Sequence, residues 1–146
     1  MENPMGWTLD DERAWNRRNP FRTYLGIEVN RVGDGGAEIA LPVTETLLQA
    51  YGMVHGGIYC VLIDTVLGTC ARSALRRDCG PMTIDLNVSF LRPSGLGRLI
   101  CRGETVKAGR SVVVGVADVL DAEGRKLATG RGSFLLREQD AYRGTG

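Results

Sequence analysis

The fold of this chain is decided by residues 49–69, which read QAYGMVHGGIYCVLIDTVLGT. The segment starts as a polar, glycine-containing loop and passes through His55-Gly56-Gly57 before it becomes apolar. Within residues 58–71 only Asp64 carries a formal charge. A helix that is apolar on all sides is normally buried on all sides, and a carboxylate inside it is costly unless it is paired or used chemically. We therefore predict a buried central helix that ends near residues 75–76, with one carboxylate to account for.

Composition and charge exclude several classes of protein. Of the 146 residues, 43% are hydrophobic and 24% are charged, which is ordinary for one soluble globular domain. The net charge is +1, and basic residues are scattered among acidic ones, so there is no electrostatic footprint for nucleic acid. The polar N-terminus shows no signal peptide, and the apolar run is too short to span a bilayer. We expect a cytoplasmic protein that binds neither nucleic acid nor membrane.

The cysteine and histidine content argues against a metal site or a disulfide framework. One histidine is present, and no two cysteines have C-x-x-C spacing. Buried free thiols in a reducing compartment are therefore expected at Cys60, Cys70, Cys79 and Cys101.

A short helix and a hairpin precede the central segment. Thr8 is placed to cap a helix with an acidic first turn, and Asn19-Pro20 is placed to end it. We expect this N-terminal arm, residues 1–24, to pack on the core rather than to close over a pocket as a flap. Residues 26–32 and 37–43 alternate around a Gly-Asp-Gly-Gly turn, which predicts a β-hairpin.

Four more strands are predicted after the central helix. Residues 83–91 alternate strictly between a polar and an apolar face. The two faces are Thr83, Asp85, Asn87 and Ser89, and Ile84, Leu86, Val88 and Phe90. Residues 97–107, 111–120 and 126–136 follow, with turns so short that neighbouring strands must be antiparallel. Glycines inside these strands suit bends or close approach of the backbone: Gly103, Gly115, Gly130 and Gly132.

The pattern predicts an α+β fold, because strands do not alternate with helices. The economical arrangement is a curved antiparallel sheet of five to six strands wrapped around one long central helix. Residues 25–137 form this domain, and the polar tail, residues 138–146, is expected to be loose.

The sequence resembles the hotdog fold, and more narrowly the hydroxybenzoyl-CoA and phenylacetate-pathway acyl-CoA thioesterases. The resemblance covers about residues 20–136. It rests on LGIEV at residues 25–29, VHGG at residues 54–57, an acid nine residues after the histidine at Asp64, and TIDLNVSFLRP at residues 83–93.

The residues and the resemblance together imply a set of site residues. Asp64 is expected to be a general base that activates water, or a nucleophile; the alternative is a structural carboxylate. Gly56 and Gly57 begin the helix, where free N–H groups can polarise a thioester oxygen, unless they form only a tight turn. The resemblance implies that Gln49 donates a second hydrogen bond to the carbonyl or holds the water, and that Thr83 orients the water, although either can be an ordinary loop or strand residue.

Substrate binding is expected from the same loop and from basic residues. The resemblance suggests that the ring of His55 fixes the loop while its backbone lines the site, since no second histidine or obvious serine nucleophile supports a triad. Arg92 and Arg110 are candidates for the phosphates of coenzyme A, as are Lys107 and Arg131, although each can simply be solvated.

Helix geometry adds a constraint on assembly. Gly56 and Asp64 are eight residues apart, which corresponds to about 12 Å along a helix axis. One thioester carbonyl is too small to meet both, so the two residues can act together only if they come from different chains. We expect an obligate homodimer with composite active sites, and the resemblance implies that such dimers often pair into homotetramers.

The resulting expectation is an acyl-CoA thioesterase that hydrolyses an aromatic or a medium- or long-chain acyl-CoA without a metal or redox cofactor. The alternative from another class is a non-catalytic acyl-CoA binding or sensing module, which binds without turnover. A dehydratase on the same fold is a third possibility, but its histidine motif is missing.

Overall fold

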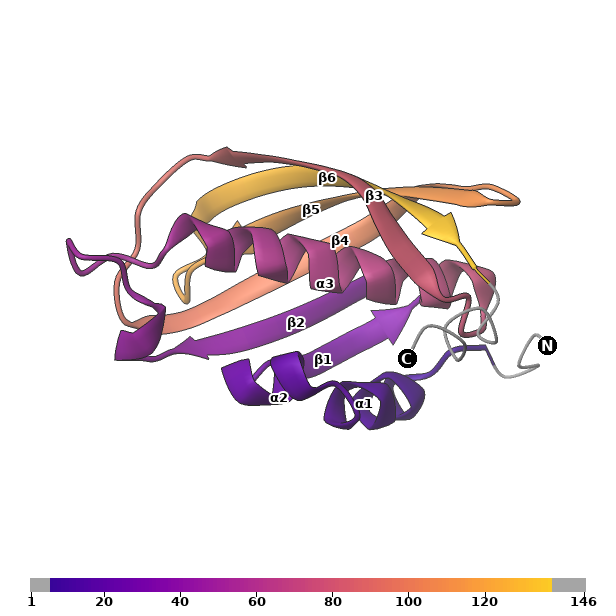
Figure 1. Ribbon diagram of the computed structural model, residues 1–146, viewed down its shortest axis with the longest axis horizontal. Helices are drawn as coiled ribbons and strands as arrows, with labels where there is room; N and C mark the ends of the chain where they lie inside the picture. The colour runs from indigo at the N-terminus through magenta and orange to yellow at the C-terminus, as the bar shows by residue number, and fades with distance from the viewer. Residues whose placement is uncertain (1–5, 138–146) are drawn as a thin grey trace, which may run out of the picture.

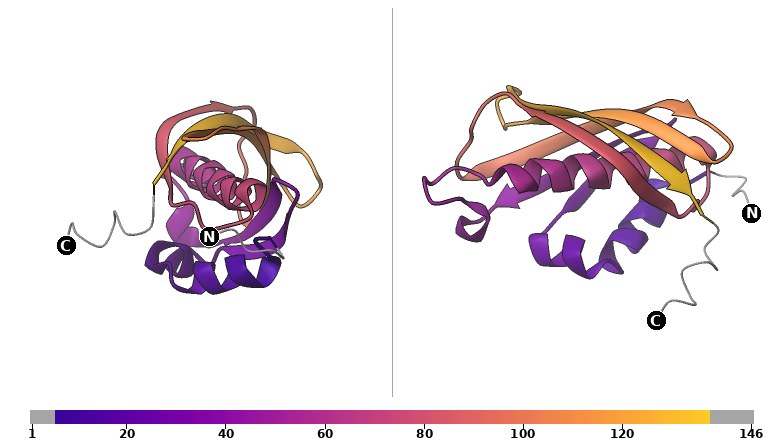
Figure 2. Two further views of the ribbon diagram at one scale, coloured as in Figure 1. Left: turned by 90° about the vertical axis from the view of Figure 1, so that its right-hand side faces the viewer. Right: turned by 45° about the horizontal axis from the view of Figure 1, so that its top comes forward.

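A six-stranded antiparallel sheet curves around one long helix in the computed structural model, which describes residues 6–137 (Figure 1). The elements in chain order are α1 (Leu9–Arg17), α2 (Pro20–Leu25), β1 (Glu28–Gly33), β2 (Gly36–Val43), the 3-10 helix η1 (Glu45–Leu47), α3 (Gly56–Leu75), β3 (Pro81–Phe90), β4 (Gly97–Ala108), β5 (Val112–Leu120) and β6 (Lys126–Leu136). In space the strand order is β1-β2-β4-β5-β6-β3. Figure 2 (left) looks along α3 and shows the sheet curling around it, which confirms the predicted hotdog architecture.

The predicted strands all form, because their turns are specified locally. In the β1–β2 hairpin, Asp34 and Gly35 both have positive φ, at 52° and 76°, between the paired residues Gly33 and Gly36. Two positive φ angles in a two-residue loop match the right-handed twist of the strands. The connections β4–β5 and β5–β6 are also antiparallel hairpins. The expected loose tail, residues 138–146, lies outside the described residues.

Close contact between α3 and the sheet depends on glycine. A Cβ at Gly115 would lie 2.8 Å from Leu67 Cδ2, and one at Gly103 would lie 2.9 Å from Val66 Cγ1. These glycines of β4 and β5 therefore let α3 sit directly on the backbone of the sheet, as predicted. By length and hydropathy alone α3 could cross a membrane, but most of it is buried within the protein.

The prediction that α3 is buried on all sides is wrong for its first half. From Gly68 to Ser73 every residue is buried, because the arm covers the side that the sheet leaves open. Nearer the N-terminus, Val61 and Asp64 are only half-buried and Gly57 is exposed. These residues are spaced three to four apart and form one stripe on the helix. Asp64 therefore lies at a surface of the single chain rather than in a dry interior.

The N-terminal arm packs on the core as predicted. Thr8 caps α1 by accepting a hydrogen bond from the Asp11 amide, and the Asp11 side chain accepts from the Thr8 amide. Glu12 is completely buried and bonds to Thr69 and Arg72 of α3. The arm therefore joins α3 directly to β1, along the open side of the sheet (Figure 1).

The prediction of strict alternation along β3 is wrong at Ile84. Thr83 pairs with Phe134 and Asp85 with Ser133, which leaves Ile84 as the extra residue of a β-bulge, 59% exposed. Because one extra residue moves side chains to the opposite face of a strand, the bulge turns Thr83 inward. Among residues 6–137, β3 pairs only with β6, so no described strand covers its other edge.

All four cysteines are free thiols, as predicted, but Cys60 is only half-buried. Burial raises the pKa of Cys70 to about 12 and that of Cys79 to about 11. Burial also raises the pKa of Cys101 well above its ordinary value of 9.0. These three thiols are therefore not nucleophiles at neutral pH.

Candidate active site

Asp64 and Thr83 are brought together by α3 and β3. The Thr83 hydroxyl donates a 2.5 Å hydrogen bond to Oδ1 of Asp64. This contact exists because the bulge at Ile84 turns Thr83 toward the helix. A hydroxyl that donates to a carboxylate keeps its own lone pairs free to accept a hydrogen bond from water. The pair can therefore hold a water molecule next to a base.

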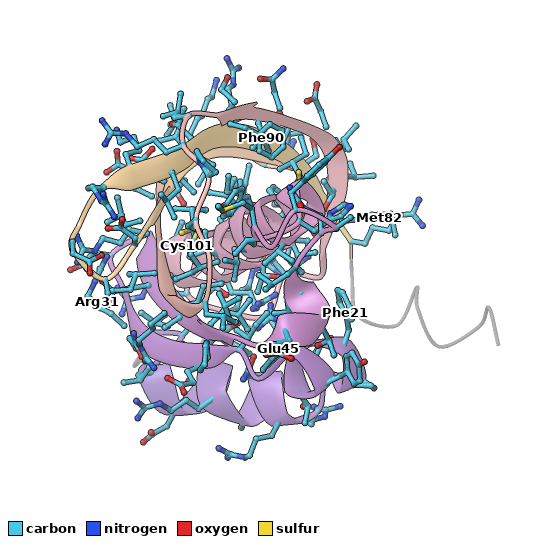
Figure 3. The ribbon with its side chains drawn as sticks, turned by 90° about the vertical axis from the view of Figure 1, so that its left-hand side faces the viewer. Phe21, Arg31, Glu45, Met82, Phe90 and Cys101 are labelled. Atoms are coloured by element: carbon cyan, nitrogen blue, oxygen red, sulfur yellow. The ribbon has the colours of Figure 1, made fainter. Side chains whose placement is uncertain are left out.

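A cavity of 610 Å³ opens beside this pair. Its wall comes from α3, the first residues of β3 and the N-terminal arm. The lining residues are Trp15, Arg18, Asn19, Phe21, Arg22, Asp64, Thr65, Gly68, Arg72, Asp78, Gly80, Pro81, Met82, Thr83 and Phe134. Figure 3 shows Phe21 of the arm and Met82 of β3 on the same side of the molecule. The arm thus has two roles, because it packs on the core and also lines the cavity.

The N-terminus of α3 presents one free amide. His55 is the N-cap, and its Nδ1 accepts the Gly57 N–H at 2.9 Å, so the ring fixes the start of the helix. Within residues 6–137 the Gly56 N–H has no hydrogen-bond partner. The Gly57 amide is therefore occupied, and the Gly56 amide is the one that a substrate oxygen can meet. A Cβ at Gly56 would lie 3.2 Å from the Phe90 ring, so this glycine lets the ring cover the helix end.

Gln49 belongs to the same end of the helix. Its backbone N–H donates to Met53 at 2.7 Å, and its side-chain oxygen accepts the Tyr51 amide. These bonds fix a tight loop whose base is the bond from the His55 amide to Leu47 (2.9 Å). The side-chain NH₂ of Gln49 stays available as a donor on the Gly56 side, not on the Asp64 side.

The structure does not bring together the two arginines predicted to bind coenzyme A. Arg92 follows the Phe90 end of β3, where its amide donates to Leu127. Arg110 is in the β4–β5 turn, at the end of the sheet where β3 begins, with β6 lying between β5 and β3. Both side chains are exposed. Within one chain they lie at opposite ends of the sheet.

Sequence reasoning missed the part of the site that the arm supplies. Phe21, Arg22 and Trp15 line the cavity, and Arg72 reaches it from α3. The aromatic side chains of the arm were a visible signal, but local pattern does not show which surface they face. Glu12 gave no signal, since an acid in the first turn of a helix is usually solvated.

The chain is similar in sequence and structure to known proteins of one superfamily. A family model described as the thioesterase superfamily matches residues 51–128. A protein of Halobacterium salinarum, which its name assigns provisionally as an esterase, is 41% identical to this chain over 129 residues. The match covers 81% of this chain and 85% of the Halobacterium protein. The 1,4-dihydroxy-2-naphthoyl-CoA hydrolase of Listeria monocytogenes is 25% identical over 115 residues, covering 79% of this chain and 94% of its own length. A solved Haemophilus influenzae thioesterase superposes with a TM-score of 0.79 at 25% identity, covering 90% of this chain and 91% of its own.

Proposed function

The chain belongs to the thioesterase superfamily, and from that premise we propose that it hydrolyses acyl-CoA thioesters at two composite sites formed by a pair of identical chains. The products are the free acid and coenzyme A. The acyl group enters the cavity beside Asp64, and the coenzyme lies outside it.

The observation that carries the proposal is the Asp64–Thr83 pair at the mouth of a cavity. Asp64 is the only acid on α3, and it lies half-buried on the same stripe of the helix as Gly57 and Val61. It serves as the base that removes a proton from water, or as the nucleophile that attacks the thioester carbon. In the first route Thr83 accepts a hydrogen bond from the same water and aims it at the carbonyl.

The Gly56 amide supplies the electrophilic half of the reaction. It is the unpaired N–H at the start of a 20-residue helix, where the positive end of the dipole lies. A thioester oxygen at this amide gains a hydrogen bond that strengthens as negative charge develops in the transition state. The side-chain NH₂ of Gln49, in the same loop, is placed to donate a second bond.

Both halves of the site cannot belong to one chain. Gly56 and Asp64 lie on the same helix, eight residues and therefore about 12 Å apart along its axis. Each must come within about 3 Å of one carbonyl group. A second copy of the chain has to provide one of the two.

The open edge of β3 favours one way of pairing. Its exposed apolar residues include Met82, Ile84 and Phe90, which is typical of an edge that another strand covers. In each chain one end of β3 contacts Asp64 through Thr83, and the other end contacts Gly56 through Phe90. Two β3 edges paired antiparallel, with Thr83 opposite Phe90 of the second copy, therefore bring Asp64 of one chain toward Gly56 of the other.

The same pairing assigns the basic residues. Arg92 lies just beyond Phe90, and Arg110 lies at the end of the sheet where β3 begins. In the pair of chains, Arg92 of one copy and Arg110 of the other come to the same end of a composite site. There they can hold the phosphates of coenzyme A.

The test is release of thiol from a panel of acyl-CoA substrates. Asp64→Asn is expected to lower kcat about a hundredfold to ten-thousandfold, and Asp64→Ala at least as much, because the proton acceptor is lost. Asp34→Asn is the matched control, an exposed aspartate in the β1–β2 turn, and it should keep the wild-type rate. Near-wild-type turnover by Asp64→Asn would refute the mechanism. Binding of acyl-CoA without any turnover by the wild type would refute the activity.

A further inference from the structure

A buried group of charged side chains joins the arm to α3. Glu12 accepts hydrogen bonds from Arg22 Nη1 (2.9 Å), Arg72 Nε (2.9 Å) and Arg72 Nη2 (2.7 Å). It also accepts from the Thr69 hydroxyl and the Trp7 indole. Burial alone would raise the pKa of Glu12, but the charges and hydrogen bonds of Arg72 and Arg22 lower it to about 2. Glu12 is thus an anion shared by two guanidinium groups.

The two arginines keep donors that Glu12 cannot satisfy. A carboxylate offers about four lone-pair sites, and five hydrogen bonds already converge on this one. Within residues 6–137 neither Arg72 Nη1 nor the Nε and Nη2 groups of Arg22 have a hydrogen-bond partner. The only sealed, unpartnered side-chain atom among the described residues is Oδ1 of Asn16, so these arginine nitrogens are not completely sealed, although the side chains of Arg22 and Arg72 are only 10% and 3% exposed.

These arginine nitrogens face the cavity that begins at Asp64. Arg22 and Arg72 both line it, although Arg72 is only 3% exposed. Asp64, Gly68 and Arg72 are spaced four apart and share one face of α3. A Cβ at Gly68 would lie 4.0 Å from Arg72 Nη1, so this nitrogen reaches back to the level of Gly68. That level is one turn, or about 6 Å, from Asp64 along the helix axis.

The far end of the cavity carries two guanidinium groups around one buried carboxylate. Arg22 and Arg72 share the single negative charge of Glu12, which is buried behind them. Burial lowers the pKa of Arg22 from its ordinary value of 12.5; Glu12 opposes this shift, and the charge of Arg72 adds to it. Arg72 is also held rigidly, with its guanidinium over the rings of Trp7 and Trp15 at 5.8 and 5.4 Å. The remaining charges of the wall are Arg18, Asp64 and Asp78.

We propose that this cavity takes an acyl group that ends in a carboxylate, the monothioester of a short dicarboxylic acid, with its thioester carbonyl at Asp64 and its carboxylate bound by Arg22 and Arg72. The assignment rests on the proposed thioesterase function and names its substrate class. An extended chain advances about 1.2 Å per bond, so about 6 Å corresponds to five bonds, the reach of a six-carbon diacid. The chain itself contacts the apolar wall of Phe21, Met82 and Phe134.

The test compares adipoyl-CoA with hexanoyl-CoA, which have equal carbon counts and differ at the far end of the acyl group. The wild type is expected to favour adipoyl-CoA about tenfold or more in kcat/KM, because charge-assisted hydrogen bonds to a buried guanidinium discriminate by about that factor. In Arg22→Gln, Glu12 stays paired with Arg72 through two hydrogen bonds, so the chain should fold. The ratio of kcat/KM for adipoyl-CoA to kcat/KM for hexanoyl-CoA should fall toward one. Arg17→Gln removes the same charge from an exposed position on the same arm and should keep the wild-type ratio.

A second variant fills the cavity and leaves every charged side chain in the sequence. In Gly68→Leu the new side chain lies between Asp64 and Arg72 Nη1, and its Cβ meets nothing closer than 3.9 Å. We expect six-carbon substrates to lose about tenfold in kcat/KM relative to acetyl-CoA, because the space for the chain is filled. An unchanged ratio of hexanoyl-CoA to acetyl-CoA turnover would contradict the placement of the acyl group.

The outcomes separate this inference from the function on which it rests. Brisk hydrolysis of hexanoyl-CoA with no preference for adipoyl-CoA overturns the inference and leaves the thioesterase intact. An equal loss of preference in Arg22→Gln and Arg17→Gln overturns it as well. Failure to hydrolyse any acyl-CoA overturns both.

Discussion

At the scale of single residues, the chemistry depends on how Thr83 is turned toward Asp64. Strict alternation along β3 would place Thr83 on the face away from α3, and the bulge at Ile84 reverses this. Asp64 could be singled out from sequence because it is the one charge in an apolar segment. The orientation of Thr83 could not, since a bulge leaves no local mark in an alternating strand. Likewise, which glycine amide stays free depends on the ring of His55.

The Thr83 hydroxyl is expected to contribute to turnover and not to folding alone. Thr83→Val keeps the shape of the side chain but removes the donor to Asp64, and kcat should fall about tenfold to a hundredfold, the range for a hydrogen bond to a charged group. Thr83→Ser restores the hydroxyl and should recover most of the rate. Steady-state thiol release checks both variants. Equal rates for Val and Thr at position 83 would remove the hydroxyl from the mechanism.

Glu12 is expected to set the acid limit of stability. Its pKa in the folded chain is about 2, below its ordinary value of 4.5, so the unfolded chain binds more protons between these values. Its stabilisation is therefore complete above about pH 5 and is lost as pH falls to about 2, a change of about 3 kcal/mol. Glu12→Gln should lose this pH dependence. It should also be about 3–5 kcal/mol less stable at pH 7, because the two arginines lose their counter-charge.

Urea denaturation at pH 7, 5 and 3 measures this effect. The control is Glu123→Gln, an exposed acid in the β5–β6 turn, which should follow the wild-type curve at every pH. If the unfolding free energy of Glu12→Gln fell with pH as steeply as that of the wild type, another group would set the acid limit of stability.

At the scale of elements, the sheet and α3 approach each other through glycine backbone. Gly115→Ala would place a Cβ 2.8 Å from Leu67 Cδ2 and 3.0 Å from the Glu104 carbonyl, so the variant should lose about 1–3 kcal/mol of unfolding free energy. Gly33→Ala, where nothing lies within 4 Å, should change little. Chemical denaturation of the two variants makes the comparison. Equal stability of the two would mean that α3 can shift away from the sheet without cost.

The elements themselves could be predicted well, and their partners less well. The hairpin of β1 and β2 follows from turn chemistry between alternating residues, and the later hairpins follow from short connections. That β3 leaves its neighbours in sequence and pairs with β6 at the far edge depends on contacts distant along the chain. The position of the arm beside Asp64 is set by Glu12, whose partner Arg72 on α3 is also distant along the chain.

At the scale of the whole molecule, the proposed mechanism gives one chain two half-sites and no complete site. The amide end of α3 and its carboxylate are too far apart to act on one carbonyl, and the open β3 edge runs between them. Helix arithmetic could predict this division from sequence. Only the structure shows that Thr83 and Phe90, at opposite ends of β3, are the residues that connect this edge to Asp64 and Gly56.

The most direct test of the composite site is complementation between two inactive chains. Gly56→Pro removes the Gly56 N–H at the first helical position, where proline is favoured and the preceding His55 is already extended. Gly56→Ala is its control, because it adds a Cβ near Phe90 but keeps the N–H. Gly56→Pro and Asp64→Asn homodimers should both be inactive.

The decisive measurement is the turnover of a heterodimer of these two chains, isolated with two different tags. One of its two sites combines the intact Gly56 of one chain with the intact Asp64 of the other, so we expect about half of the wild-type kcat per dimer. If each site lay within one chain, both sites would carry a defect. A heterodimer as inactive as its parents would contradict the composite site.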